Sequence, residues 1–183
     1  MDARLIINGV EIKLGHKELV DICYSIEDYA RNADIFHELA KSNSSEIRSN
    51  VAGNKHLKDE TFDMLIQDSS LEIMRTIISR DHFKRRMDKE IIERFIETGD
   101  TEILTNIAED ILDCADLYDV CEMDWLCEKL IIKKDPAVRY ELAGNDSTPV
   151  FFLNKLAEDS DINVAEKAQE TLSALEEDEF DDE

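Results

Sequence analysis

The chain has 183 residues, and its 44 Asp and Glu against 21 Lys and Arg give a formal net charge of -23. Such a surface repels nucleic-acid phosphates and anionic lipid, because affinity for both depends largely on Lys and Arg contacts. We therefore expect a basic protein partner, no direct nucleic-acid binding and no membrane association. Acidity that serves solubility alone is an equally simple reading of this composition.

No apolar run approaches the roughly 18–20 residues that a membrane span needs. The first residues lack a basic region followed by a long apolar core, so we expect no signal peptide. The four cysteines form no C-x-x-C pair, which favours a reduced, cytoplasmic compartment. No cofactor is expected.

The N-terminal 15 residues contain two short β-prone runs around Asn8-Gly9. Asn-Gly is the preferred pair for a two-residue hairpin turn, because both positions need a positive φ. We predict a hairpin over residues 1–15, which must lie against the helices or a partner because an isolated hairpin is marginal in water. Apolar residues at helical spacing then predict a capping helix over residues 16–33.

Residues 34–175 follow one repeating pattern, in which an apolar residue near the end of one helix is followed eight positions later by an apolar anchor in the next. The anchors are Leu39/Ile47, Leu65/Ile73, Phe95/Ile103, Leu130/Val138 and Leu156/Val164. Ser, Thr and Asp between them suit helix N-caps. Such units stack on one another to bury their apolar faces. We predict an all-α αα-solenoid of about five short repeats, forming one domain over residues 1–175.

The clearest repeat spans Ala137–Ala168, and Ala143-Gly144-Asn145 recurs 91 positions earlier as Ala52-Gly53-Asn54. Arg139 likewise recurs as Arg48, which predicts a structural role for both, such as binding carbonyls of an adjacent repeat. The motif V-R-x-x-L-A-x-N-x-x-T-P-x-x-x-L-x-x-L-A-x-D over Val138–Asp159 resembles the leucine-rich repeat variant, a short relative of HEAT-like αα-repeats. The resemblance implies a helical-repeat fold and a general binding habit. Some members of that family carry an iron–sulfur cluster on closely spaced N-terminal cysteines, but Cys23 stands alone here.

Two acidic regions depart from the repeat. Residues 176–183 are almost entirely Asp and Glu, which predicts a disordered tail. The overlong unit Glu97–Glu128 holds eleven acids and no Lys or Arg. Its acids at every third position and two aromatic residues suggest a protein-docking patch. The candidate residues are Asp110, Asp113, Asp116, Asp119, Glu122, Trp125 and Tyr118. The competing interpretation is a solvated helix face with Trp125 in the core between Leu126 and Leu130.

Other chemistry finds little support in the sequence. Cys114, Cys121 and Cys127 are too widely spaced for a typical zinc site, so we expect buried small hydrophobic residues there. No Gly-rich phosphate loop or nucleophile elbow is present. The leading hypothesis is a non-enzymatic interaction module that presents an acidic surface to a basic protein. The alternatives are a nucleic-acid-mimicking inhibitor or a toxin-neutralising immunity or anti-defence protein and, more remotely, an enzyme.

Overall fold

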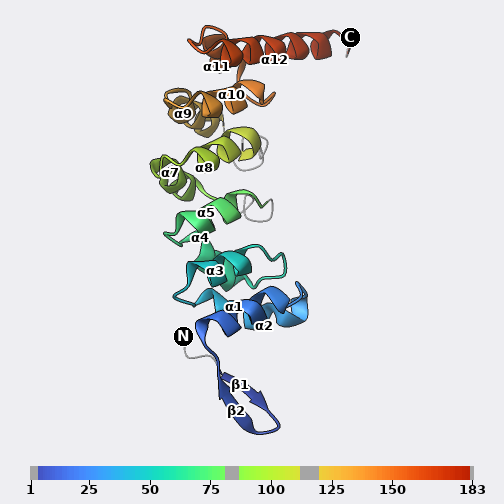
Figure 1. Ribbon diagram of the computed structural model, residues 1–183. Coiled ribbons are helices and arrows are strands. Elements are labelled where there is room, and N and C mark those ends of the chain that lie inside the picture. The colour runs from blue at the N-terminus through green and yellow to red at the C-terminus, as the bar shows by residue number, and fades with distance from the viewer. Residues whose placement is uncertain (1–3, 81–86, 112–119, 182–183) are drawn as a thin grey trace. The chain divides into compact units, whose positions relative to one another are not determined.

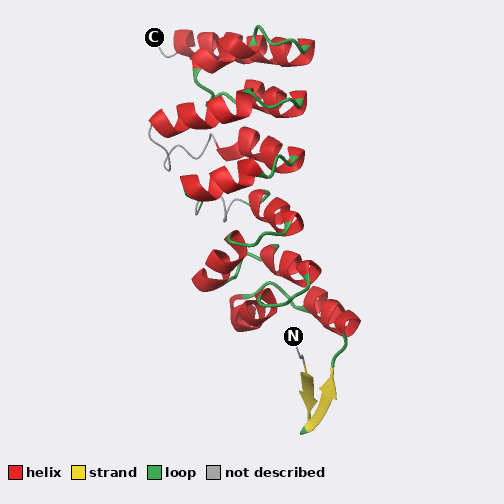
Figure 2. Cartoon of the chain, turned by 90° about the vertical axis from the view of Figure 1, so that its left-hand side faces the viewer, coloured by secondary structure: helices red, strands yellow, loops and turns green. Residues whose placement is uncertain are grey.

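A computed structural model describes residues 4–80, 87–111 and 120–181 of the chain. It divides into two compact units, Met1–Phe83 and Lys84–Glu183, each of which is considered by itself. Both units consist of short helices packed in pairs, after a small N-terminal hairpin in the first (Figures 1 and 2). The chain therefore has the predicted all-α repeat fold.

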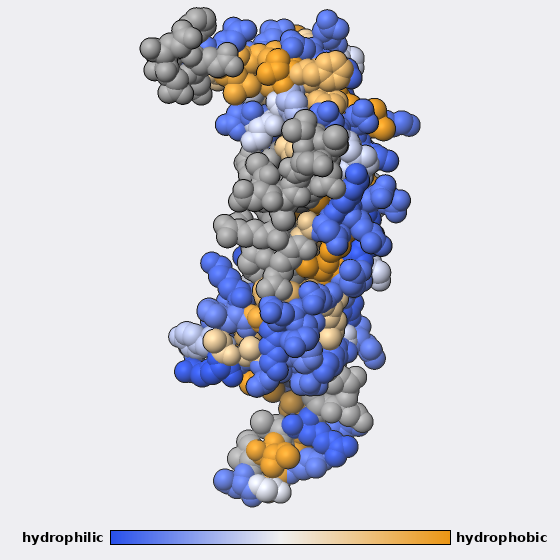
Figure 3. All heavy atoms as spheres, turned by 180° about the vertical axis from the view of Figure 1, so that it is seen from behind, coloured by the Kyte–Doolittle hydropathy of each residue, from blue (hydrophilic) through white to orange (hydrophobic). Residues whose placement is uncertain are grey.

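The hairpin forms as predicted from strands β1 (Arg4–Ile7) and β2 (Val10–Lys13). The strands pair antiparallel, with Ile7 opposite Val10. Asn8 and Gly9 have φ values of 51° and 82°, as a two-residue turn requires. All four β2 residues are exposed, and Figure 3 shows apolar atoms uncovered on the hairpin. The hairpin thus does not gain its stability by burying β2 against the helices.

The segment after the hairpin differs from the predicted capping helix. Helix α1 (His16–Ser25) ends at Ser25, and a separate 3₁₀ turn, η1 (Ala30–Asn32), leads into the first repeat. Asp28 lies between them and accepts hydrogen bonds from the backbone N–H groups of Lys55 and His56 at 2.9 and 3.1 Å. This carboxylate ties the segment to the loop of the next repeat, a long-range contact that helical periodicity does not reveal.

In the part of the chain that the structure describes, five helix pairs follow, two in the first unit and three in the second. We call the first member of each pair the A helix and the second the B helix. The first unit contains α2 (Ala33–Ala40), α3 (Ser45–Ala52), α4 (Asp59–Ile66) and α5 (Leu71–Ile78). The second contains α7 (Lys89–Glu97), α8 (Thr101–Asn106), α9 (Val120–Ile131), α10 (Pro136–Gly144), α11 (Val150–Leu156) and α12 (Ile162–Asp181).

The predicted anchors form the cores of the two units. All ten are buried, and Leu39, the most exposed of them, retains only 6% of its surface. The predicted caps are also found where Asp100 accepts from the N–H of Ile103 at 3.2 Å and Asp135 from that of Ala137 at 3.0 Å. These bonds satisfy backbone donors that the first turn of a helix leaves unpaired.

The overlong unit contains a π-helical turn, η2 (Ile107–Ile111), directly after α8. The amide of Asn145 donates to the carbonyl oxygens of Ala108 and Glu109 at 2.9 and 2.8 Å. Asn54, at the equivalent position of the first unit, instead donates to the carbonyls of its own helix. The two asparagines thus occupy the same repeat position but make different contacts, and only Asn145 bonds to the π-helical turn.

At the C-terminal end the predicted tail is wrong for residues 176–181, because α12 continues to Asp181. Glutamate has a high helix propensity, and a helix already anchored on α10 and α11 extends more readily than a new one forms. No helix in the described part of the chain, α12 included, is long and apolar enough to cross a membrane.

Candidate protein-binding surface

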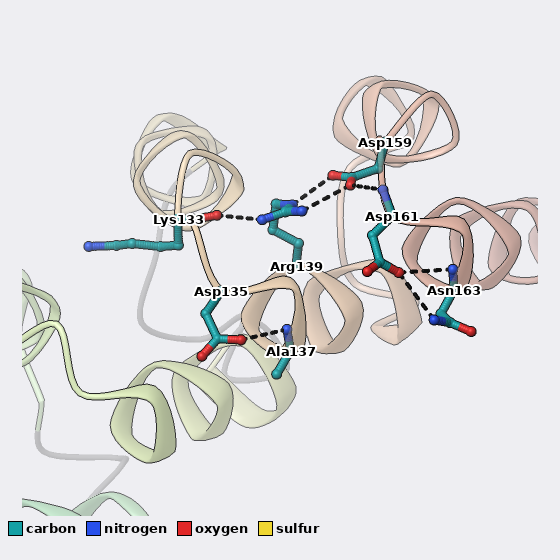
Figure 4. A network of polar contacts seen from close by, with 7 residues as sticks. All are labelled: Lys133, Asp135, Ala137, Arg139, Asp159, Asp161 and Asn163. Atoms are coloured by element: carbon teal, nitrogen blue, oxygen red, sulfur yellow. Dashed lines mark hydrogen bonds and ion pairs between the residues drawn. The ribbon is translucent and has the colours of Figure 1, made fainter.

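Arg139 on α10 joins two consecutive repeats (Figure 4). Its Nε and Nη2 donate to the two carboxylate oxygens of Asp159 at 2.7 and 3.0 Å, and its Nη1 donates to the carbonyl of Lys133 at 2.6 Å. Only 12% of the Arg139 side chain and 11% of the Asp159 side chain are exposed. These hydrogen bonds also hold the pKa of Asp159 below its usual range. We call this arrangement the clasp.

Arg48 makes the equivalent contacts in the first unit. Its Nε and Nη2 donate to Asp68 at 2.6 and 3.2 Å, and its Nη1 donates to the carbonyl of Ser42 at 2.8 Å. In both clasps the carboxylate also accepts a backbone N–H two residues later, at Ser70 and at Asp161. The structural role predicted for the recurring arginines is therefore confirmed, and neither is available for a ligand.

The predicted acidic patch is only partly covered by the structure. Asp113, Asp116, Tyr118 and Asp119 lie outside the described residues. Glu122 belongs to the first turn of α9. Asp110 is half-buried in η2, which packs on α8 and α10. The role of these residues in binding stays a prediction.

Trp125 lies on α9 and is half-buried, between the exposed and the core positions considered for it, and its neighbours Leu126 and Leu130 are buried. The Nζ of Lys89 on α7 lies 4.8 Å from its ring centroid, and that of Lys129 lies 6.0 Å away. Trp125 thus belongs to the A-helix side of the second unit.

Phe151 occupies the same repeat position on α11, with 63% of its surface exposed and the Nζ of Lys155 4.1 Å from its ring centroid. The two aromatic residues each precede a lysine by four positions, which places the pair on one side of the helix. The aromatic–lysine pair thus recurs on two successive A helices, α9 and α11, whereas the acids of η2 follow a B helix.

In the second unit, the B helices carry more net negative charge than the A helices. On α8 with η2, on α10 and on α12, unburied residues recur at positions i, i+3, i+4 and i+7, which form one stripe along each helix. α10 packs against both α8 with η2 and α12, so the three stripes are adjacent. The charged and aromatic members, which we call the acidic face, are Glu102, Glu109, Tyr140, Glu141, Glu166, Lys167 and Glu170.

Glu141 lies at the centre of the acidic face. Partial burial raises its pKa, the nearby Glu109 carboxylate raises it further, and Lys167 opposes both effects. The stem of Lys167 crosses Gly144, where an added Cβ would come within 2.8 Å of Cε. Its Nζ lies 3.5 Å from Glu170. One lysine therefore meets several carboxylates, and the negative charge around Glu141 remains under-compensated.

The acidic face continues along α12. A shallow groove of about 550 Å³ opens between side chains of its outer surface, and four of the six residues lining it are acidic or amide-bearing. The lining consists of Glu166, Gln169, Glu170, Ser173, Ala174 and Glu177. The groove is open to solvent, which suits an extended chain better than a buried small molecule.

The acidic face was missed in the sequence because its members lie on three helices separated by about thirty residues each. The available signal was the repeat itself: Tyr140 and Glu141 follow the anchor Val138 by two and three positions, as Glu166 and Lys167 follow Val164.

The prediction for cysteine is confirmed at Cys127, which is buried. Burial, and after it the nearby Asp124 charge, raises the pKa of its thiol to about 12. Among the described residues, no group of three or more His, Cys, Asp or Glu is placed to hold a metal ion.

No known family model and no curated protein matches the sequence. Among solved structures, one titled as computationally designed armadillo repeat proteins for modular peptide recognition aligns with 87% of this chain and 94% of its own. The identity is 14% and the TM-score 0.36. A likeness this low carries no argument about function, which has to be inferred from the chain's own surface.

Proposed function

We propose that the protein is a non-enzymatic interaction module whose acidic face binds a basic segment of another protein. The observation that carries the proposal is the negative charge of the three adjacent stripes of the second unit. These stripes hold five glutamates and one lysine. The corresponding stripes of α3 and α5 in the first unit carry only Glu46 and Glu72, together with Arg75. These repeat stripes therefore carry more net negative charge in the second unit than in the first, which supports the proposal.

The stripes favour an extended ligand that crosses the helices. Packed helices lie about 8–10 Å apart, and an extended chain advances about 3.3 Å per residue. A basic residue at every third position of the ligand would therefore meet successive stripes, on α8, α10 and α12 in turn. We infer a recognition pattern of Lys or Arg separated by two other residues.

Tyr140 and Glu141 have complementary parts in this proposal. Tyr140 is 39% exposed on the central helix and offers a ring to the stem or charge of a bound Lys or Arg. Glu141 bears an under-compensated charge, and a ligand cation would neutralise it. Binding would then relieve the repulsion between Glu141 and Glu109 that the free protein carries.

The experiment compares two variants with the same net charge. The face variant combines Glu102→Gln, Glu141→Gln and Glu166→Gln, and the control combines Glu90→Gln, Glu128→Gln and Glu158→Gln, all exposed acids of the A-helix side. Anisotropy is measured with a fluorescent peptide that has Lys at every third position, and with an isomer whose lysines are contiguous.

Exposed charge pairs contribute roughly 0.2–1 kcal/mol each, so the face variant should bind the spaced peptide about tenfold more weakly. The control should stay within about twofold of the wild type, and the contiguous peptide should bind more weakly than the spaced one. Equal losses in both variants would mean that net charge, and not this surface, drives binding.

Affinity capture from the native host with mass spectrometry, at low and high salt, would identify the natural partner. Capture through the acidic face should weaken with salt, since screening shortens the reach of exposed charges. A captured nuclease or nucleic-acid-binding protein that DNA or RNA displaces would instead favour the inhibitor hypothesis.

We also propose that the repeats belong to the leucine-rich repeat variant, which the Val138–Asp159 motif supports.

A further inference from the structure

Among the described residues that make up the acidic face, Lys167 on α12 is the only basic one. Its stem lies across Gly144 of α10, where an added Cβ would come within 2.8 Å of Cε and 3.7 Å of Cγ. Glycine at position 144 thus leaves the space that the stem takes up. Glu141 precedes Gly144 by three positions, which places both on one side of α10. The lysine of one helix therefore covers part of the acidic stripe of its neighbour.

The charge of Lys167 acts on two carboxylates of this face. Its Nζ lies 3.5 Å from an oxygen of Glu170. Burial and then the Glu109 charge raise the pKa of Glu141, and the charge of Lys167 opposes both effects. Within the described part of the chain, the Glu141 carboxylate accepts no hydrogen bond and forms no ion pair. Lys167 is therefore the cation that partly compensates Glu141 in the free protein.

This compensation is easily exchanged. The side chains of Lys167 and Glu170 are 34% and 71% exposed, and ion pairs in such surroundings contribute little to stability. Lysine carries a compact charge on a flexible stem, so Lys167 can swing into water without disturbing α12. A lysine or arginine of a bound segment has the same chemistry and can take its place.

We propose that Lys167 is an internal competitor for the acidic face, which occupies the subsite beside Glu141 and Glu170 until a lysine or arginine of the bound segment displaces it. This inference rests on the proposed function, because it concerns the same ligand. Displacement lowers the apparent affinity, since the subsite has to empty first. A ligand with a single cation only exchanges one charge for another here, whereas a spaced basic segment also gains contacts on the neighbouring stripes. The competitor therefore selects for the spaced segment.

Two variants of equal net charge test the competitor. Lys167→Gln empties the subsite, whereas Lys155→Gln removes the same charge from the A-helix side, where Lys155 lies over the ring of Phe151. Anisotropy is measured with the peptide that has Lys at every third position. Lys167→Gln should bind it about fivefold more tightly than the wild type, and Lys155→Gln should stay within about twofold.

A double-mutant cycle between protein and peptide tests the displacement itself. A peptide whose central lysine is replaced by glutamine lacks the charge that we assign to this subsite. With the wild type this replacement should weaken binding by no more than about twofold, because Lys167 stays in place and supplies the charge. With Lys167→Gln it should weaken binding about fivefold, since no other cation then fills the subsite.

The outcomes separate this inference from the proposed function. Equal gains from Lys167→Gln and Lys155→Gln, or additive losses in the cycle, would overturn the competitor and leave the acidic face as a binding surface. If neither the wild type nor Lys167→Gln binds the spaced peptide, both proposals are wrong. A titration followed by NMR gives a readout without ligand: the pKa of Glu141 should rise in Lys167→Gln and not in Lys155→Gln, and an unchanged pKa in both would also overturn the competitor.

Discussion

The clasp between Arg139 and Asp159 predicts a specific loss of stability. Asp159→Asn keeps the shape of the side chain but removes the charge that two guanidinium N–H groups contact at 2.7 and 3.0 Å. Removing one partner of a fully buried ion pair costs about 3–5 kcal/mol, whereas exposed pairs contribute less than about 1 kcal/mol. With 12% and 11% exposure the pair lies near the buried limit, and we expect a loss of about 2–3 kcal/mol in the free energy of unfolding.

Urea unfolding of Asp159→Asn, Arg139→Met and the double variant would measure the coupling. Methionine is a fair replacement because buried Met74 occupies the equivalent position in another repeat. The double variant should be more stable than the sum of the single losses predicts, with a coupling of about 1–3 kcal/mol.

The same clasp has a defined pH dependence. Hydrogen bonds from Arg139, followed by that from the N–H of Asp161, lower the pKa of Asp159 in the folded state. A lowered carboxyl pKa stabilises the fold above the unfolded pKa of about 3.9, and this contribution disappears as the pH falls through the lower folded pKa. The difference between wild type and Asp159→Asn should therefore shrink below about pH 4. Additive losses, or a difference that does not change with pH, would refute this account of the clasp.

Two further predictions concern Glu141 and the buried thiols. Burial and Glu109 raise the pKa of Glu141, so its charge destabilises the folded state above that pKa. Glu141→Gln should therefore raise the melting temperature at pH 7. The gain should vanish as the pH falls toward about 4.3, the pKa of an unperturbed glutamate. The same change should weaken binding of the spaced basic peptide, a combination that a purely structural glutamate would not show. Cys23 and Cys127 are buried and their pKa values are raised, so peptide mapping after iodoacetamide treatment should find both modified in urea and neither in the folded protein; rapid modification without urea would contradict their burial.

Local sequence determined much of the architecture. The anchors eight positions apart, from Leu39/Ile47 to Leu156/Val164, are all buried. Packing between neighbouring helices removes these apolar side chains from water, which is favourable. Caps such as Asp100 and Asp135 act within two or three residues, and so does the Asn8-Gly9 turn. These interactions depend on neighbours in the chain, which is why spacing alone predicts them.

Only the tertiary structure decided which side chains meet on the surface. Glu109, Tyr140 and Glu166 lie on three elements, and packing of α10 between its neighbours makes them one face. The ring of Trp125 meets Lys89 of another helix, and the end of α1 is followed by a segment that Asp28 holds to a distant loop. The described helices likewise leave all four residues of β2 exposed, which the local sequence does not reveal. Periodicity within one helix determines which residues avoid water, but the electrostatics of a surface are set by charges that the fold brings together from distant parts of the chain.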